Sequence, residues 1–292
     1  QLAAVYPADE AEALAWWVAE DTTGLTRTQL QFGCKDTTFL RNTQEIIDRL
    51  LHFEPVQYIF GHTLWNGLDL QVTPATLIPR PETAELVEEI NDRMVHVQTV
   101  NDRMVHVLDI GTGSGCIAIA LKKRRPEWEV TGIDISAEAV ARENARRNNV
   151  EVNFLQADIF SDEIEQNEKI RKWKNDQIND QMVNEQMVNI IVSNPPYIRE
   201  SEKSTMKPNV LDYEPSSALF VPDDDPLLFY RRIASLRLGK YLFFEINENL
   251  SDETGTLLRS LGYTDIRLSR DLYGKPRVLQ AQLPDENSTS QK

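Results

Sequence analysis

From residue 105 onward, short apolar segments typical of buried β-strands alternate with segments typical of helices. This alternation predicts strands at 105–110, 130–135, 152–157, 188–193, 240–246, about 265–269 and about 278–283. Strands that are separated by helices usually form a parallel sheet, because a parallel connection needs a long crossover. The pattern therefore predicts an α/β fold built on a doubly wound, seven-stranded sheet. Ligands of such sheets bind beyond the carboxyl ends of the strands.

A glycine-rich loop follows the first of these strands and precedes an expected helix. Glycines at this place allow the backbone to approach a ligand closely at the N-terminus of the helix. The dinucleotide-binding fingerprint would place its third glycine at position 116, where the chain has Cys116. The spacing therefore favours S-adenosylmethionine over a nicotinamide dinucleotide. The expected cofactor-binding residues of the loop are Gly111, Thr112, Gly113, Ser114 and Gly115.

Acidic residues also end the second and third expected strands. Asp134 lies at the end of the second strand, where a carboxylate can bind both ribose hydroxyls of a nucleoside. Asp158 follows the third strand and can accept a hydrogen bond from an adenine amino group. Ile159 or Phe160 would then pack on the adenine ring. Together with the glycine loop, these residues predict a nucleoside-containing cofactor at one edge of the sheet.

The fourth expected strand ends in the sequence Asn194-Pro195-Pro196-Tyr197. The two prolines stop the strand, remove two N–H donors and hold the residues before them out of the helical region. A stiff loop results, which presents an amide side chain, backbone carbonyls and an aromatic ring together. This set suits a planar NH2 group, since the oxygens can accept its hydrogens and the ring can cover its face. All four residues are candidate catalytic residues, and Asn194 is also a candidate cofactor contact.

The loop alone does not distinguish a side-chain amide from the amino group of adenine. An amide nitrogen is a poor nucleophile, so the expected contribution is placement. The Asn194 oxygen and the Pro195 carbonyl would accept the two N–H bonds, and Tyr197 would pack on the amide. The chain has four histidines without metal-ligand spacing and no arrangement that suggests a serine hydrolase triad, so no metal is expected.

The net charge of −15 argues against a protein that binds nucleic acid by broad neutralisation of phosphates. Two cysteines are too few for a disulfide framework, which favours a reducing compartment. The N-terminal residues lack the pattern of a signal peptide, and no apolar run approaches membrane-spanning length. These features together predict a cytoplasmic protein that is not bound to a membrane.

Three regions are expected along the chain. Residues 1–53 predict a helical domain, with helices at 8–20, 26–32 and 36–53. Residues 54–79 predict an extended or β-hairpin linker that begins with the apolar run at 56–60, and residues 80–292 predict the α/β domain. The segment 91–97 recurs identically at 101–107, and a related low-complexity stretch covers 175–189. We interpret the first as a tandem duplication, whose second copy runs into the strand at 105–110, and the second as a surface insertion, both without a chemical role.

The motifs of this chain resemble those of the protein-(glutamine-N5) methyltransferases of the HemK/PrmC type, which methylate the GGQ glutamine of peptide-chain release factors. The resemblance covers nearly the whole chain, and it is strongest at the glycine loop, at 193–197 and in four further segments. Those segments are Pro55-Val56-Gln57-Tyr58-Ile59, Thr76-Leu77-Ile78-Pro79-Arg80-Pro81-Glu82-Thr83, 239–245 and Pro276-Arg277-Val278. The resemblance implies the class I fold of S-adenosylmethionine-dependent methyltransferases and a helical domain, residues 1–53, that docks the release factor. It also implies that Asn194 to Tyr197 bind the glutamine.

The chain departs from the family pattern at two positions. Ala84 stands where the family usually has an acid, and Ile159 stands where tryptophan is frequent. Three other functions stay open: a ribosomal-protein glutamine methyltransferase, an adenine-N6 nucleic-acid methyltransferase, and a non-catalytic protein that senses the cofactor. The expected protein is a monomer that acts on release factors and not directly on nucleic acid.

Overall fold

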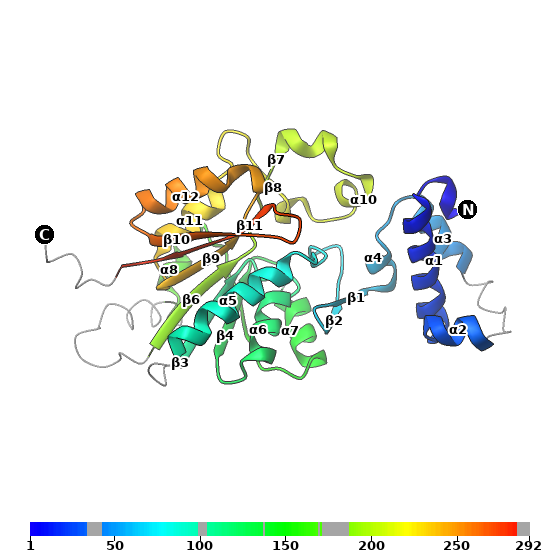
Figure 1. Ribbon diagram of the computed structural model, residues 1–292, viewed down its shortest axis with the longest axis horizontal. Helices are drawn as coiled ribbons and strands as arrows, with labels where there is room; N and C mark the ends of the chain where they lie inside the picture. Colours follow the sequence, from blue (N-terminus) through cyan, green and yellow to red (C-terminus); the bar gives the residue numbers. More distant parts are fainter. Residues whose placement is uncertain (34–42, 99–103, 137, 169, 171–186, 285–292) are drawn as a thin grey trace, which may run out of the picture.

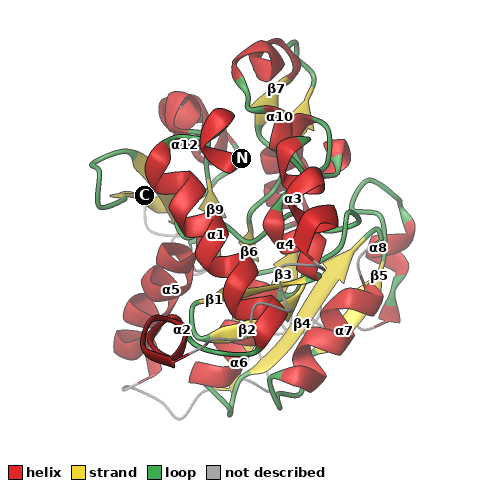
Figure 2. Cartoon of the chain, turned by 90° about the vertical axis from the view of Figure 1, so that its right-hand side faces the viewer, coloured by secondary structure: helices red, strands yellow, loops and turns green. Residues whose placement is uncertain are grey.

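The computed structural model describes residues 1–33, 43–98, 104–136, 138–168, 170 and 187–284. A group of N-terminal helices is connected through a two-stranded hairpin to a larger α/β domain (Figure 1). In Figure 2 the N-terminal helices lie in front of the large sheet. No helix in these described ranges is both long enough and apolar enough to cross a membrane.

The N-terminal helices pack around a small core of their own. They are η1 (Leu2–Ala4), α1 (Ala8–Thr23), α2 (Arg27–Gly33), α3 (Thr43–Leu51) and α4 (Val56–Phe60). Their buried apolar residues are Leu2, Ala11, Val18, Leu50 and Val56. The helices predicted at 8–20 and 26–32 are thereby confirmed. The predicted helix over 36–53 is present as α3, and residues 36–42 lie outside the described ranges.

The prediction of extended chain at 56–60 is wrong, since these residues form α4. Pro55 precedes the helix with an extended backbone, and Gly61 ends it in the left-handed conformation, with φ 75°. The aromatic and β-branched residues of this run favour strands by propensity. Burial decides otherwise, because Val56 packs into the core of the N-terminal helices while Tyr58 is covered by other residues. Tertiary packing often overrides such a weak local preference.

The hairpin itself is shorter than the predicted linker. It consists of β1 (His62–Trp65) and β2 (Leu68–Gln71), which pair antiparallel. Trp65, Leu68 and Leu70 are buried in the main core of the α/β domain. The hairpin therefore belongs by its packing to the larger domain, while the helix before it belongs to the smaller one.

The large sheet has the strand order β10-β11-β9-β6-β3-β4-β5. The strands are β3 (Met104–Ile110), β4 (Glu129–Asp134), β5 (Asn153–Gln156), β6 (Met187–Ser193), β9 (Tyr241–Glu245), β10 (Thr264–Arg270) and β11 (Pro276–Gln282). Five of them run parallel, which confirms the predicted doubly wound α/β sheet. β11 departs from this pattern and runs antiparallel to both its neighbours, β9 and β10. A tight turn connects β10 to β11, and without a crossover the two strands must be antiparallel.

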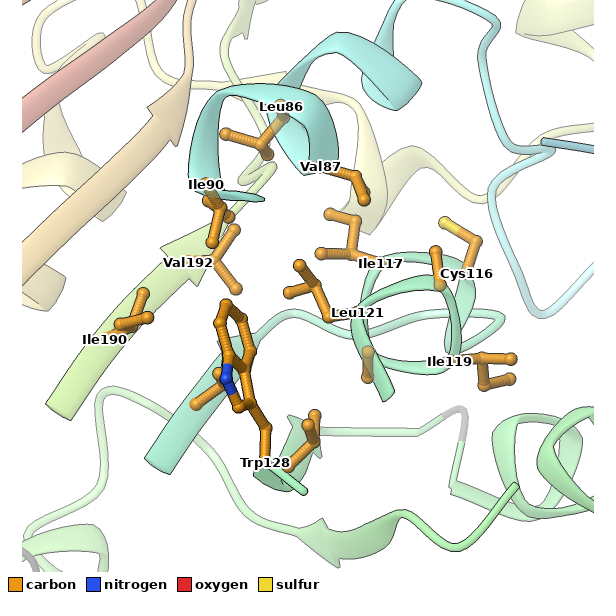
Figure 3. Packing of buried hydrophobic residues seen from close by; sticks show 14 of the residues in the cluster. Leu86, Val87, Ile90, Cys116, Ile117, Ile119, Leu121, Trp128, Ile190 and Val192 are labelled. Atoms are coloured by element: carbon orange, nitrogen blue, oxygen red, sulfur yellow. The ribbon is translucent and has the colours of Figure 1, made fainter. Parts of the chain in front are cut away.

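Helices cover both faces of the sheet. They are α5 (Thr83–Gln98), α6 (Cys116–Arg124), α7 (Glu138–Arg147), α8 (Glu163–Gln166), α11 (Leu228–Leu236) and α12 (Ser251–Ser260), with η5 (Glu248–Leu250) before α12. Alternate residues of each central strand join different cores: Ile190 and Val192 lie in one cluster, and Ile191 lies in the other. Figure 3 shows side chains of α5 and α6 beside those two strand residues, together with the buried Trp128.

An additional segment follows β6 and precedes α11. It contains β7 (Ile198–Arg199), η3 (Glu200–Thr205), α10 (Pro208–Leu211), η4 (Ser216–Ala218) and β8 (Phe220–Val221). The first copy of the duplicated segment, 91–97, lies within α5, and residues 104–107 of the second copy lie within β3. Most of the low-complexity stretch lies outside the described residues, apart from positions 187–189 in β6.

Candidate active site

The glycine loop lies between β3 and α6, as predicted. Gly111, Gly113 and Gly115 adopt φ values of 74°, 53° and 82°, a region that residues with a Cβ rarely enter. The N–H groups of Gly111 and Thr112 donate to the carbonyl of Ile133 at 2.8 and 3.0 Å, which fixes the loop against the end of β4. The loop therefore presents backbone at the carboxyl edge of the sheet, where a nucleoside can approach it.

Asp134 lies beside this loop at the end of β4. One carboxylate oxygen accepts from Gly113 N at 2.8 Å, and the other accepts from Ser136 N at 2.9 Å. The Ser136 hydroxyl also donates to this second oxygen at 3.5 Å. The carboxylate is thus held in place at the end of β4, and because the side chain is only partly buried a ribose can reach it.

The residues predicted to contact adenine lie after β5. Asp158 is exposed and accepts from Phe160 N at 2.8 Å. Ile159 is only 9 % exposed and packs in the core cluster on the second face of the sheet. Phe160 is 40 % exposed and meets Phe229 edge to face, with the ring centroids 5.1 Å apart. Both an acceptor and an apolar surface are therefore present at this strand end.

A third acid, which sequence reasoning did not include among the site residues, lies beneath the glycine loop. Asp109 is fully buried, and its Oδ2 accepts from the Thr112 hydroxyl at 2.6 Å and from Ala118 N at 3.3 Å. Its other oxygen, Oδ1, is buried without a hydrogen-bond partner among the described residues. Burial raises the pKa of this carboxyl from 3.8 to about 7, although the two hydrogen bonds oppose the shift.

The Asn194-Pro195-Pro196-Tyr197 loop lies next to the glycine loop. β6 pairs directly with β3, and the Ser193 hydroxyl donates to the Ile110 carbonyl at 2.6 Å across the two strand ends. The strand pairing creates this neighbourhood, and the hydrogen bond fixes it. A group bound at Asn194 therefore lies close to a cofactor held by the glycines.

The Asn194 side chain is oriented by a chain of hydrogen bonds. Its Nδ2 donates to the Thr83 hydroxyl at 3.2 Å, and Thr83 Oγ1 donates to Glu245 Oε2 at 2.7 Å. A hydroxyl has a single proton, so an oxygen that donates to a carboxylate can only accept from the asparagine amide. This network assigns the amide orientation and leaves the Asn194 Oδ1 as the atom available to accept from a ligand.

Tyr197 is held at both ends. Its hydroxyl donates to Glu245 Oε1 at 3.3 Å, and its backbone carbonyl accepts from Asn247 Nδ2 at 3.1 Å. Burial and the nearby Glu245 charge raise the pKa of the phenol, so it stays protonated at neutral pH. Tyr197 therefore provides a fixed aromatic surface and not a base.

A pocket of about 110 Å³ opens beside this loop. It is lined by Leu77, Arg80, Asn194, Pro195, Tyr197, Ile198, Met206, Val210, Ala218 and Leu219. The lining is mostly apolar, with the amide of Asn194 and the guanidinium of Arg80 as its polar side chains. Such a pocket suits a short aliphatic chain that ends in a polar group.

Arg80 forms an ion pair with Glu214, a residue far along the chain. Its Nη2 lies 2.7 Å from Glu214 Oε1, and the other oxygen of Glu214 accepts from Ile78 N at 3.3 Å. Glu214 is almost fully buried, and the guanidinium of Arg80 offsets part of the cost of burying its charge. The ion pair ties the segment after the catalytic loop to the chain that precedes α5.

The structure thus brings together the glycine loop, Asp134 and Asn194 to Tyr197, with Asp158 and Ile159 at the next strand end. Sequence reasoning did not identify Asp109, Thr83, Glu245 or Asn247 as part of the site. No cluster of three or more His, Cys, Asp or Glu side chains suited to a metal occurs within the described ranges.

Comparison with known proteins identifies relatives of both regions of the chain. A family model described as "PrmC N-terminal domain" matches residues 1–61, and one described as "Methyltransferase domain" matches residues 101–211. A protein named release factor glutamine methyltransferase from Bacteroides thetaiotaomicron is 40 % identical, covering 95 % of this chain and 94 % of its own. Its namesake from Flavobacterium psychrophilum is 37 % identical over 96 % of this chain and 94 % of its own.

Among solved structures, the N-terminal domain of human METTL16 in complex with SAH has a similar fold. The TM-score is 0.50 at 15 % identity, and the match covers 93 % of this chain and 94 % of that one. This likeness concerns the fold. The sequence identity to the bacterial relatives and the near-complete coverage on both sides carry the assignment, and the chain belongs to the release factor glutamine methyltransferase family.

Proposed function

We propose that this protein transfers a methyl group from S-adenosylmethionine to the side-chain amide nitrogen, N5, of the GGQ glutamine of peptide-chain release factors. The observation that carries the proposal is the orientation of Asn194, whose amide nitrogen is bound to Thr83. Its oxygen is thereby left to accept from a substrate NH2 group at the edge of an apolar pocket. The names of the bacterial relatives support the same substrate.

The residues present fit the cofactor. S-adenosylmethionine supplies a methyl group on a positively charged sulfur, and it carries a ribose, an adenine and an ammonium group. Residues 111–115 offer backbone, Asp134 offers acceptors for the ribose, and Asp158 and Ile159 offer an acceptor and an apolar contact for adenine. The Oδ1 of Asp109, which has no hydrogen-bond partner among the described residues, is a buried acceptor beneath the same loop. A cationic ligand there would favour the charged form of a carboxyl whose pKa is about 7. Asn194, the first residue of the catalytic loop, completes the set of expected cofactor contacts.

The catalytic loop acts by placement. Asn194 Oδ1 and the Pro195 carbonyl accept the two N–H bonds of the substrate amide, and Tyr197 covers its face. The amide nitrogen is thereby held in one orientation toward the cofactor side of the loop, with Pro196 stiffening the backbone between the Pro195 carbonyl and Tyr197. Placement of this kind can contribute as much as roughly 7–11 kcal/mol in the best intramolecular models. A strong base is not required, because the methylated nitrogen loses its proton readily.

The charge of the chain favours a protein substrate over a nucleic acid. The net charge of −15 disfavours binding to a polyanion. An adenine-N6 methyltransferase is therefore the weaker alternative, and a ribosomal-protein glutamine methyltransferase would use the same chemistry on another protein.

The N-terminal region, residues 1–53, is the proposed docking domain, residues 54–79 the linker and residues 80–292 the catalytic domain. We expect the protein to act as a cytoplasmic monomer without a nucleic-acid substrate. Hydrogen exchange of the full chain with and without a release factor tests the docking role. Protection confined to 80–292 would contradict it.

Mass spectrometry of the GGQ peptide of a release factor, after incubation with the protein and S-adenosylmethionine, tests the reaction. A gain of one methyl group on the glutamine is expected. Parallel incubations with ribosomal protein and with DNA or RNA separate the alternatives. Binding of the cofactor without turnover on any substrate would indicate a sensor and contradict the proposal.

A further inference from the structure

A buried carboxylate lies behind the catalytic loop and takes no part in the binding steps described above. Glu245 ends β9 and is only 1 % exposed. Its two oxygens accept from two different hydroxyls, those of Thr83 at 2.7 Å and Tyr197 at 3.3 Å. One side chain therefore joins the start of α5 to the loop that receives the substrate.

Some features of the surroundings of Glu245 disfavour its charged form, and others favour it. Burial raises its pKa, and the carboxylate of Glu82 adds to the shift. The hydrogen bonds from Thr83 and Tyr197 and the positive charge of Arg277 lower it. The Tyr230 hydroxyl donates to the backbone carbonyl of Glu245 and not to its carboxylate. A cation and two donors around one buried acid form an arrangement that holds an acceptor in a fixed position.

The direction of the hydrogen bonds follows from the two contacts of Thr83. Its single proton is donated to Glu245 Oε2, so the lone pairs of Thr83 face the Asn194 amide nitrogen. If Thr83 had no acceptor behind it, its proton could turn to the Asn194 oxygen, and the asparagine amide could flip. The flipped amide would present two hydrogens to a substrate NH2 group, and the contact would be repulsive.

We propose that Glu245 is a positioning residue that acts through Thr83 to hold the Asn194 amide with its oxygen toward the substrate. The inference deepens the proposed function, because it rests on Asn194 accepting from the glutamine amide. Neither Glu245 nor Thr83 touches the substrate in this account. Their effect is therefore expected to vanish when Asn194 is absent.

The first test measures the amide orientation without any cofactor or substrate. Asn194→Ala identifies the side-chain NH2 resonance of Asn194 in the NMR spectrum by its loss. Thr83→Ser keeps the hydroxyl, and we expect it to leave the hydrogen exchange of this NH2 group unchanged. Thr83→Val removes the hydroxyl at nearly constant volume and should speed exchange roughly tenfold, the loss of about one hydrogen bond.

Thr254 offers a matched control for these variants. It is fully buried on α12, and its hydroxyl donates to the backbone carbonyl of Leu250 at 2.7 Å. Thr254→Val therefore removes a buried hydroxyl of the same kind whose hydrogen bond lies outside the Asn194–Thr83–Glu245 network. We expect it to leave the Asn194 exchange and kcat unchanged. The control separates a general cost of the substitution from a specific effect on the amide.

The second test is a double-mutant cycle on kcat with a release factor as substrate. Thr83→Val should lower kcat by about 10- to 100-fold, the range expected for a misplaced reacting group. Glu245→Gln adds an NH2 group that can donate to Thr83, and it should lower kcat in the same direction while the Kd for the cofactor stays unchanged. In the Asn194→Ala background both substitutions should change kcat by less than about threefold, since their common target is gone.

The two experiments distinguish the failure of this inference from the failure of the proposed function. The NMR measurement does not depend on the substrate. Unchanged hydrogen exchange of the Asn194 NH2 group in folded Thr83→Val would overturn the proposed positioning of Asn194 by Glu245 and Thr83. Should that variant fail to fold, Glu245→Gln gives the same measurement. Equal losses of kcat in the presence and absence of Asn194 would overturn it as well. If the unsubstituted protein leaves the release factor unmodified, the proposed function is contradicted. The hydrogen-exchange data would still show whether Glu245 and Thr83 position the Asn194 amide.

Discussion

Replacement of Asp109 by asparagine should change how the stability of the protein depends on pH. The carboxyl is fully buried, and burial raises its pKa from 3.8 to about 7. The hydrogen bonds from Thr112 and Ala118 oppose this shift, and the charge of Asp134 adds to it. In the unfolded chain the same group is expected to return to a pKa of about 3.9.

The sign of the effect follows from the raised pKa of Asp109 in the folded state. The folded protein holds this proton more tightly, so the stabilising contribution is complete below about pH 4 and is lost as the pH rises through about 7. A shift from 3.8 to about 7 corresponds to on the order of 4 kcal/mol in total. About 3 kcal/mol of this should be lost between pH 5 and pH 8.

Urea unfolding of the unsubstituted protein and of Asp109→Asn at pH 5, 6, 7 and 8 measures this contribution. Asparagine has nearly the same shape and no charge, and its oxygen can still accept from Thr112 and Ala118. The free energy of unfolding of the unsubstituted protein should fall by about 3 kcal/mol more than that of the variant. At pH 5 the variant should be the less stable one, because its NH2 group lacks a buried partner, which costs about 1–3 kcal/mol. Parallel pH profiles for the two proteins would refute the reasoning.

Three further predictions concern the same site. Binding of cationic S-adenosylmethionine near pH 7 should lower the pKa of Asp109 and release protons, which calorimetry in buffers of different ionisation enthalpy detects; Asp109→Asn should abolish the release. Gly132→Ala places a Cβ 2.7 Å from Thr112 Oγ1, and the crowding should destabilise the protein by about 1–3 kcal/mol and weaken cofactor binding in calorimetry. Arg80→Met leaves the buried Glu214 without its cation; since Arg80 is 33 % exposed, we expect a loss of about 1–3 kcal/mol in urea unfolding and a raised KM for the release factor. Replacement of both Arg80 and Glu214 by Met should recover most of the stability, and a normal KM for Arg80→Met would contradict the role of this ion pair.

The parts of the site that could be predicted from the sequence lie in short, continuous stretches. The glycine loop and the Asn194-Pro195-Pro196-Tyr197 loop each follow a strand and carry their geometry in their own residues. The order of a doubly wound sheet then brings the two strand ends together, as the bond from Ser193 to Ile110 shows. Hydrophobic periodicity and the backbone preferences of glycine and proline are local signals, and they were sufficient to predict these two loops.

The supporting residues could not be predicted in this way. Thr83 lies 111 positions from Asn194 in the sequence, and Tyr197 lies 48 positions from Glu245. A threonine at a helix start and an acid at a strand end have ordinary local roles, so neither stands out. Their function arises only from contacts that the fold creates. The prediction for residues 56–60 was wrong for a related reason, because burial of this segment against the N-terminal helices outweighs its local preference for a strand.

The most direct test of the central claim is single-turnover methyl transfer by Asn194→Ala. The claim is that the Asn194 oxygen orients the glutamine amide. The variant, saturated with S-adenosylmethionine, is mixed with excess release factor, and methylation of the GGQ peptide is followed by mass spectrometry. We predict a Kd for the cofactor within about threefold of the unsubstituted protein and a rate lower by at least about 100-fold. A rate within about threefold of the unsubstituted protein would contradict the account.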